Sequence, residues 1–171
     1  MLKYHVFETR LGWVGAVASE CGIRHMTLPE PSRRAAEQEI ATENAGMVRD
    51  AGHFTDLEAR LDRYFAGGNE DLTTIPVDPV GTASGFFAKA REACRAIPAG
   101  ETRTYAWLAA RAGSPGASRA AGQAMARNPV PLLVPCHRVV GTDGKLHGFG
   151  GSIGTPLKAR LLAIEAAAQQ R

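Results

Sequence analysis

The chain has 171 residues, 44% of them hydrophobic and 22% charged, a composition typical of a soluble globular protein of one or two domains. No apolar run approaches the roughly 18 residues needed to cross a membrane, and no signal-peptide segment follows the first five residues. Three cysteines, Cys21, Cys94 and Cys136, are an odd number in a chain without an export signal. We therefore expect free thiols and a cytoplasmic location.

The charge is distributed unevenly along the chain. Residues 1–80 carry 8 Lys and Arg against 13 Asp and Glu, a net charge of −5, whereas residues 81–171 carry 12 against 4, a net charge of +8. A basic half is typical of a surface that faces nucleic-acid phosphates, although a solvated basic face gives the same count. If either half contacts nucleic acid, the charge favours residues 81–171.

The N-terminal half is predicted to contain three short strands in succession, two helices and a fourth strand. Three strands joined by short turns indicate a small antiparallel sheet, and the second helix is well supported because its apolar residues recur every three or four positions. Glycine, proline and serine at 78–85 predict a linker between the halves. The predicted ranges are 2–9, 13–19 and 22–28 for the first strands, 31–42 and 54–65 for the helices, and 72–77 for the last strand.

The C-terminal half is predicted to be mostly helical, with a helix over 86–97 and a final helix that begins at Thr155-Pro156. Between them, a helix capped by Thr102 or Thr104 runs to Arg111, and another starts at Ser114-Pro115 and runs to about Arg127. Two helices joined by a tight turn that contains glycine resemble a helix-turn-helix. The pattern alone is weak, because most such pairs are only packing units.

One cysteine, Cys136, lies in a segment that its prolines restrict. Pro129, Pro131 and Pro135 exclude a long helix or an inner strand there and hold the thiol in a fixed place. A free cysteine is usually a small buried hydrophobic residue. Here the basic neighbour His137, followed by a second basic residue, favours a reactive thiolate.

Motifs before and after this cysteine extend the pattern over most of the C-terminal half. These segments are Ile97–Tyr105, Ala117–Gly122, Ala124–Pro131, Pro135–Val140, His147–Gly151 and Leu161–Glu165. Together they resemble the O6-alkylguanine-DNA alkyltransferases, also called methylated-DNA–protein-cysteine methyltransferases. A chance match over this length is very improbable.

The resemblance implies a two-domain architecture and a function in DNA repair. Residues 1–80 would form an α/β scaffold domain of RNase H-like form, and residues 81–171 a mostly α-helical domain with a helix-turn-helix, which binds DNA and accepts the alkyl group. The protein would transfer the alkyl group from O6-alkylguanine, and perhaps O4-alkylthymine, in double-stranded DNA to its own cysteine. It would act once, as a monomer, without a cofactor.

The resemblance also assigns the catalytic residues. The thiol of Cys136 would pass its proton through a water to His137, which pairs with Glu165. Asn128 would hold the turn that carries the cysteine, and Tyr105 would crowd a backbone phosphate and assist rotation of the nucleotide. Because a thiol with a pKa of about 8.5 is only a few per cent ionised at neutral pH, a histidine oriented by a carboxylate raises the reactive fraction.

The DNA contacts would come from the helix that contains Ala117–Gly122. Its small side chains would let it approach the minor groove, although alanine also suits any close-packed helix. The resemblance implies that Arg119 inserts into the base stack where the target base has been extruded. The other matching DNA-contact positions are Thr104, Ala117, Ala120 and Gly122, and those of the substrate pocket are Met125, Pro131, Val134, Val139, Phe149, Gly150 and Gly151.

The sequence departs from the family pattern at several places. Phe86-Phe87 and Ala90-Arg91 replace a Phe-Gln and a Val-Trp pair, and Phe149-Gly150 replaces a tyrosine that is often followed by serine. Two extra residues within 152–156 would separate Glu165 from His137 if they displaced the last helix.

Three alternatives stay open on the sequence alone. A lesion-sensing protein of alkyltransferase-like type would bind alkylated DNA without efficient transfer. A cysteine hydrolase would use the same Cys, His and Glu on an ester or amide. A structural zinc ion would need four ligands, and only His5, Cys21 and His25 are available on neighbouring strands, so no metal is expected.

Overall fold

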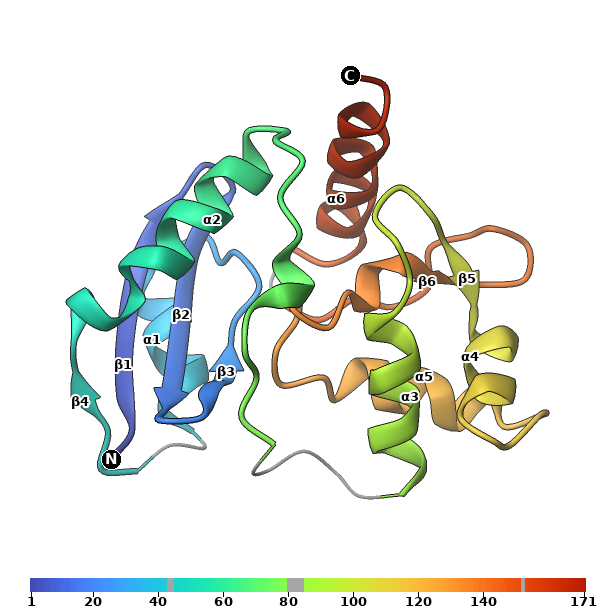
Figure 1. The fold of residues 1–171 in the computed structure, drawn as a ribbon, viewed down its shortest axis with the longest axis horizontal. Coiled ribbons are helices and arrows are strands. Elements are labelled where there is room, and N and C mark those ends of the chain that lie inside the picture. Colours follow the sequence, from blue (N-terminus) through green and yellow to red (C-terminus); the bar gives the residue numbers. More distant parts are fainter. Residues whose placement is uncertain (43–44, 80–84, 152) are drawn as a thin grey trace.

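The computed structural model describes residues 1–42, 45–79, 85–151 and 153–171. The N-terminal half forms a small sheet with two helices, and the C-terminal half forms a mostly helical lobe beside it (Figure 1). Within the described ranges no helix combines the length and the apolar character needed to span a bilayer.

The sheet is mixed, with the strand order β3-β2-β1-β4. Its first three strands are antiparallel, as predicted, but β4 pairs in parallel with β1, so the prediction of a purely antiparallel sheet was wrong. At the β2–β3 turn, a side chain on Gly22 would meet the Pro76 carbonyl at 2.5 Å, and its φ of +145° also favours glycine. The strands are β1 (Lys3–Thr9), β2 (Gly12–Ser19), β3 (Gly22–Met26) and β4 (Val48–Arg49).

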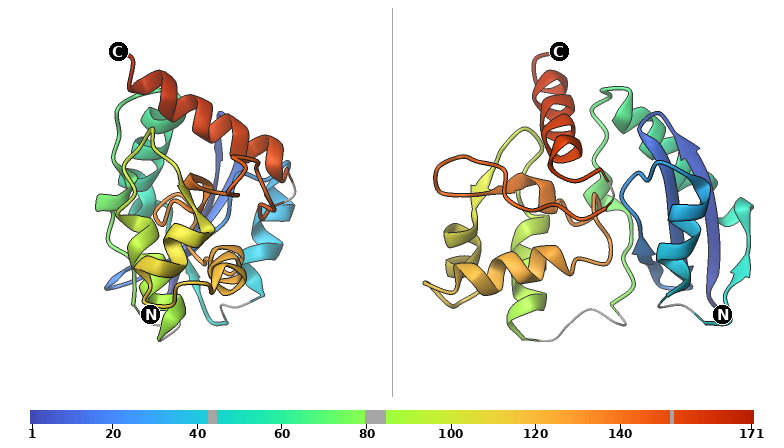
Figure 2. Two further views of the ribbon diagram at one scale, coloured as in Figure 1. Left: turned by 90° about the vertical axis from the view of Figure 1, so that its right-hand side faces the viewer. Right: turned by 180° about the vertical axis from the view of Figure 1, so that it is seen from behind.

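Helices α1 (Arg33–Ala41) and α2 (Thr55–Phe65) cover opposite faces of the sheet (Figures 1 and 2). This follows from the alternation of side chains along a strand. On β1, Val6 packs in the small cluster under α1, whereas the next residue, Phe7, packs in the large core that includes the buried face of α2. The 3-10 turn η1 (Ala51–Phe54) leads into α2.

The predicted strand over 72–77 was wrong. Residues Leu72–Thr74 form a 3-10 turn, η2, because the Asp71 carboxylate accepts hydrogen bonds from the amide and the hydroxyl of Thr73. Within residues 72–77, Val77 alone pairs with a strand, through one isolated parallel β-bridge to Ile23. The predicted linker at 78–85 lies mostly outside the described residues.

The C-terminal lobe follows the predicted order, with one boundary displaced. Helix α5 begins at Ser118 and not at Ser114, because Gly116 has φ +88° and the Ala117 amide closes a turn on the Ser114 carbonyl. The parallel pairing of β5 with β6 places the start of α4 beside the cysteine segment. The elements are α3 (Phe86–Arg95), β5 (Arg103–Thr104), α4 (Tyr105–Arg111), α5 (Ser118–Ala126), η3 (Cys136–Arg138), β6 (Val139–Val140) and α6 (Thr155–Ala168).

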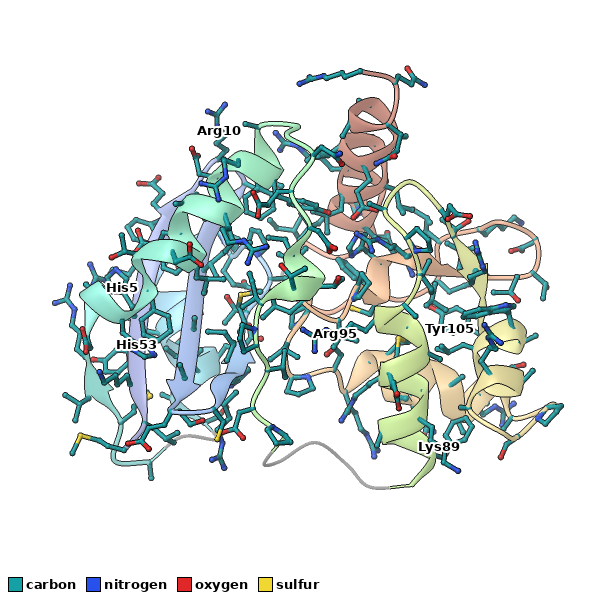
Figure 3. All side chains as sticks on the ribbon, viewed as in Figure 1. His5, Arg10, His53, Lys89, Arg95 and Tyr105 are labelled. Carbon is teal, nitrogen blue, oxygen red and sulfur yellow. The ribbon has the colours of Figure 1, made fainter. Side chains whose placement is uncertain are left out.

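One hydrophobic core continues from the α2 face of the sheet into the C-terminal lobe. Backbone bonds also join the lobes, since the Met26 amide donates to the Pro129 carbonyl at 2.9 Å. Arg95 points from α3 toward the N-terminal half, where its Nη2 donates to the carbonyls of Thr73 and Ile75 at 2.6 Å (Figure 3). The two lobes therefore hold the cysteine segment between them.

Candidate active site

Asn128 fixes the turn that carries the cysteine. Its Nδ2 donates to the Val134 carbonyl at 2.8 Å, and its Oδ1 accepts from the Val130 amide at 3.1 Å. The same Val134 carbonyl accepts from the Cys136 amide at 2.8 Å. Since Pro129, Pro131 and Pro135 lack amide donors, the side chain of Asn128 supplies bonds that their backbone cannot make.

Cys136 lines a pocket of about 920 Å³ and is itself buried, with 7% of the residue exposed. The cavity lies between α5, the cysteine turn, β3 and the loop before α6. Ten of the predicted site residues line it, namely Tyr105, Arg119, Gly122, Met125, Asn128, Pro131, Cys136, Phe149, Gly150 and Gly151. These ten residues make up more than half of the cavity lining.

His137 and Glu165 form a buried pair directly behind the cysteine. His137 Nε2 lies 2.6 Å from Glu165 Oε1, and each side chain is 1% exposed. The two extra residues in the preceding loop therefore do not separate them. His137 Nδ1 is also buried and has no hydrogen-bond partner, so this nitrogen is free to accept a proton.

The carboxylate of Glu165 has further donors that were not predicted. Arg138 reaches both of its oxygens, with Nη2 at 2.8 Å from Oε1 and Nε at 3.0 Å from Oε2. Tyr64 of α2 donates its hydroxyl to Oε1 at 2.7 Å. Arg138 lies in the Pro135–Val140 motif, directly after the Cys-His pair. Its ion pair depends on the position of α6, which no local pattern predicts.

This environment sets the charge of the pair. Burial alone would raise the pKa of Glu165, but the hydrogen bonds from His137 and Arg138 hold it far below its usual range. Burial lowers the pKa of His137 in spite of the nearby carboxylate. We therefore describe Glu165 as ionised and His137 as neutral, with its proton on Nε2, where the carboxylate accepts it.

The thiol itself is not poised as a thiolate in this state. Burial raises the pKa of Cys136, and hydrogen bonding from Asn128 and the charge of Lys158 oppose the rise without cancelling it. The basic neighbours alone suggested a lowered pKa, but burial outweighs them here. A proton acceptor is therefore needed before the sulfur can react.

Lys158 is a further pocket residue that was missed. It is 1% exposed, and its Nζ lies 5.7 Å from the ring centroids of both Tyr105 and Phe149. Burial lowers its pKa. Its position offered a signal, because Lys158 precedes Glu165 by seven residues and so shares the buried face of α6. The other unpredicted lining residues are Met26, Leu28, Glu39, Ser118, Ala126 and His147.

Besides His137 and Glu165, five predicted site residues lie outside the cavity lining. Val134 and Val139 are core residues, 5% and 0% exposed. Thr104 caps α4, where its hydroxyl accepts from the Trp107 amide at 3.0 Å. The other two are Ala117, the N-cap of α5, and Ala120, which is half-buried on that helix.

The rim of the pocket is formed by α5, which packs closely against α4. A Cβ on Gly122 would lie 3.9 Å from the ring of Tyr105, at ordinary van der Waals distance. Arg119 is exposed at the same rim. Its position leaves the guanidinium free to contact a ligand outside the protein.

The zinc candidates do not form a metal site. His5 Nε2 lies 3.2 Å from the carboxylate of Glu58, and Cys21 is exposed in a turn. Among the described residues no group of three His, Cys, Asp or Glu side chains is placed to hold a metal ion.

A buried cysteine that lines a pocket, followed by a neutral histidine that an ionised glutamate orients, defines a protein with a cysteine nucleophile. Comparison with known proteins then identifies the family. The family described as 6-O-methylguanine DNA methyltransferase, DNA binding domain, matches residues 85–167. The methylated-DNA–protein-cysteine methyltransferase of Methanosarcina acetivorans is 34% identical over 164 residues, which cover 96% of this chain and 98% of the relative. The enzyme of Mycobacterium leprae is 40% identical over 129 residues, 75% of each chain.

Solved structures agree with this result. Mycobacterium tuberculosis OGT in complex with DNA superposes with a TM-score of 0.78 at 30% identity, covering 97% of this chain and 94% of that chain. The O6-methylguanine-DNA methyltransferase of Pyrococcus kodakaraensis gives a TM-score of 0.73 at 26% identity, covering 96% and 99%. The chain belongs to the methylated-DNA–protein-cysteine methyltransferase family, which confirms the resemblance found in its motifs.

Proposed function

We propose that the protein repairs O6-alkylguanine in double-stranded DNA by moving the alkyl group to Cys136. The observation that carries this proposal is the buried, unpartnered Nδ1 of His137 beside a buried thiol. The Nε2 of the same ring is held by ionised Glu165. The histidine can therefore accept the proton that the thiol must lose.

The reaction is a displacement at the alkyl carbon. Through a bridging water, the thiol proton passes to Nδ1 of His137, and Sγ of Cys136 then attacks the carbon bonded to O6. The S–C bond forms as the C–O6 bond breaks, and its electron pair stays on the guanine, which takes up a proton. Tyr105 suits this last donation because it lines the pocket and its hydroxyl is protonated at neutral pH; the water–histidine relay is the other donor. The product is a thioether with no easy leaving path, so each molecule acts once.

The target base has to leave the duplex to reach Cys136. We assign α4 and α5 to a helix-turn-helix, with α5 in the minor groove and Arg119 in the space left by the flipped base. The exposure of Arg119 at the pocket rim supports this role, as do the small side chains of α5. Ala117, Ala120, Gly122 and Thr104 would then lie near the DNA backbone.

The base itself would occupy the cavity described above. Phe149 offers an aromatic face, and the backbone of Gly150 and Gly151 allows close approach to a flat base. Met125 and Pro131 supply apolar contacts. Val134 and Val139 support the turn from the core side and do not reach the base.

The wider organisation follows from the same assignment. Residues 1–80 form a scaffold domain, and the strand order with β4 parallel to β1 supports an RNase H-like form. Residues 81–171 form the domain that binds DNA and accepts the alkyl group. The cysteines are free, which supports a cytoplasmic location. The proposed reaction needs only the DNA and the side chains of this protein, so we propose a monomer that uses no cofactor.

A restriction-protection assay tests the proposed chemistry. A duplex with one O6-methylguanine inside a restriction site resists cleavage, and transfer of the methyl group restores it. The wild-type protein is expected to restore at most one site per molecule, and Cys136→Ala none. Cys21→Ser is the matched control, because this thiol is exposed and does not line the pocket. Repair by Cys136→Ala, or many sites per molecule, would overturn the proposal.

A further inference from the structure

Tyr64 brings a hydroxyl from the N-terminal lobe into the active site. It lies on α2, more than seventy residues before the cysteine, and is 3% exposed. Its Oη lies 2.7 Å from Glu165 Oε1 and 3.4 Å from His137 Nε2. Among the described residues its hydroxyl makes no other polar contact, so it serves this site alone.

The three atoms form a triangle in which the proton positions are determined. An ionised carboxylate only accepts, so the Tyr64 hydroxyl must donate to Glu165, and the third atom, His137 Nε2, must carry a proton to meet the same oxygen. Burial and the charge of Glu165 raise the pKa of Tyr64 well above its usual value. The hydroxyl therefore stays protonated, and so remains a donor, at neutral pH.

We infer that Tyr64 is a positioning residue for alkyl transfer, through which the N-terminal lobe holds Glu165 and fixes the tautomer of His137. This inference rests on the proposed function, because it concerns the base that accepts the thiol proton. Tyr64 does not touch the substrate. It acts on Glu165, and Glu165 acts on His137.

Donation by Tyr64 also tunes the base. A hydrogen bond to Glu165 spreads its negative charge and so weakens the attraction that Glu165 exerts on a protonated His137. Loss of the hydroxyl would concentrate that charge and raise the pKa of His137. The other charged groups that act on His137 are Arg138 on η3 and Lys158 on α6, and both lower its pKa. A rise in the pKa of His137 in Tyr64→Phe would therefore come from the stronger charge on Glu165.

The alternative is that Tyr64 only fills space between the lobes. Its ring packs edge-on against Phe65 at 5.5 Å between centroids, and both residues belong to the large core. Phe65 is 6% exposed and has no polar atom in its side chain. Phe65→Leu therefore removes packing at the same place without changing a hydrogen bond, and it is the matched control for Tyr64→Phe.

Two measurements on the full-length protein separate these roles. The first is the single-turnover rate of methyl transfer from O6-methylguanine duplex as a function of pH. In Tyr64→Phe we expect the rate near neutral pH to fall about tenfold, the factor expected from one hydrogen bond to a charged group. The acid limb of the pH–rate profile, where the rate falls as His137 becomes protonated, should move to higher pH. In Phe65→Leu the acid limb should stay in place.

The second measurement is a titration of the His137 ring nitrogens by NMR in 15N-histidine-labelled protein without DNA. The inference predicts two results. In the wild type the neutral His137 ring carries its proton on Nε2, and in Tyr64→Phe the pKa of His137 is higher than in the wild type. An unchanged pKa and an unchanged acid limb would reduce Tyr64 to a packing residue. If the wild-type protein transferred no methyl group, the proposed function would fall, whereas the titration would still decide the role of Tyr64.

Discussion

Glu165→Gln is expected to lower both the stability of the protein and the rate of alkyl transfer. The amide has nearly the shape of the carboxylate but carries no charge and accepts on one atom only. Arg138, 5% exposed, would lose its ion partner. His137 would face an amide group that can donate to Nε2, and this would favour the tautomer with the proton on Nδ1.

The loss of stability follows from the burial of the pair. Removing one partner of a buried ion pair costs about 3–5 kcal/mol, because the remaining charge stays unpaired in a poorly polar environment. For a chain of this length, each kcal/mol lowers the midpoint of thermal unfolding by roughly 2–4 °C. We therefore expect a fall of about 6–20 °C. Transfer should slow by about 10²–10⁴-fold if His137 no longer serves as the base.

Thermal unfolding by calorimetry and single-turnover methyl transfer measure the two effects. Glu70→Gln is the matched control, since Glu70 also pairs with two arginines, Arg60 at 2.6 Å and Arg63 at 2.9 Å, but nearer the surface. Its substitution should cost about 1 kcal/mol or less and leave transfer unchanged. A Glu165→Gln protein that lost less stability than the control, or that transferred at the wild-type rate, would refute the reasoning.

Three further outcomes are expected. Asn128→Ala removes two hydrogen bonds of the cysteine turn and should lower the free energy of unfolding by about 1–3 kcal/mol, with slower transfer; unchanged denaturant midpoints would contradict it. Because burial raises the pKa of Cys136, iodoacetamide should modify exposed Cys21 before Cys136. Labelling of Cys136, followed by peptide mass, should accelerate only above the ordinary thiol pKa of about 8.5; rapid labelling of Cys136 at pH 7 would oppose this. Arg119→Ala should unfold as the wild type does but transfer from duplex at least about tenfold more slowly, while its reaction with the free base O6-benzylguanine stays unchanged; equal losses on both substrates would argue against a role in base flipping.

Patterns along the chain predicted the parts of the fold that depend on local periodicity. The apolar spacing over 54–65 predicted α2 and its buried face, and the proline-restricted segment before Cys136 was correctly excluded from long helices and strands. The strand predicted over 72–77 was wrong because the Asp71 side chain bonds to the backbone and stabilises a turn. The start of α5 was misplaced because Gly116 takes a positive φ, which a Ser-Pro start signal does not reveal.

The site was predicted less completely, because part of it depends on contacts between the lobes. The family resemblance assigned Phe149 to the pocket, which it lines, and paired His137 with Glu165, which the structure brings together across 28 residues. The periodicity over 54–65 places Tyr64 on the apolar face of α2. Nothing in the neighbouring sequence distinguishes a tyrosine that bonds to a carboxylate from one that only packs. Arg138 was missed for a similar reason, because its partner Glu165 lies on α6 and is brought near only by the tertiary fold. Lys158 could have been found from its spacing to Glu165 on the same helix.

The most direct test of the central claim is intact-mass spectrometry after incubation with a duplex that contains one O6-methylguanine, followed by peptide mapping. The account predicts a gain of about 14 Da, the mass of one added CH₂, on the peptide that contains Cys136, saturating at one per protein molecule. Binding to the alkylated duplex without a change in mass would contradict it and place the protein among lesion-sensing binders. A methyl group on Cys21 or Cys94 in place of Cys136 would contradict the assignment of the acceptor.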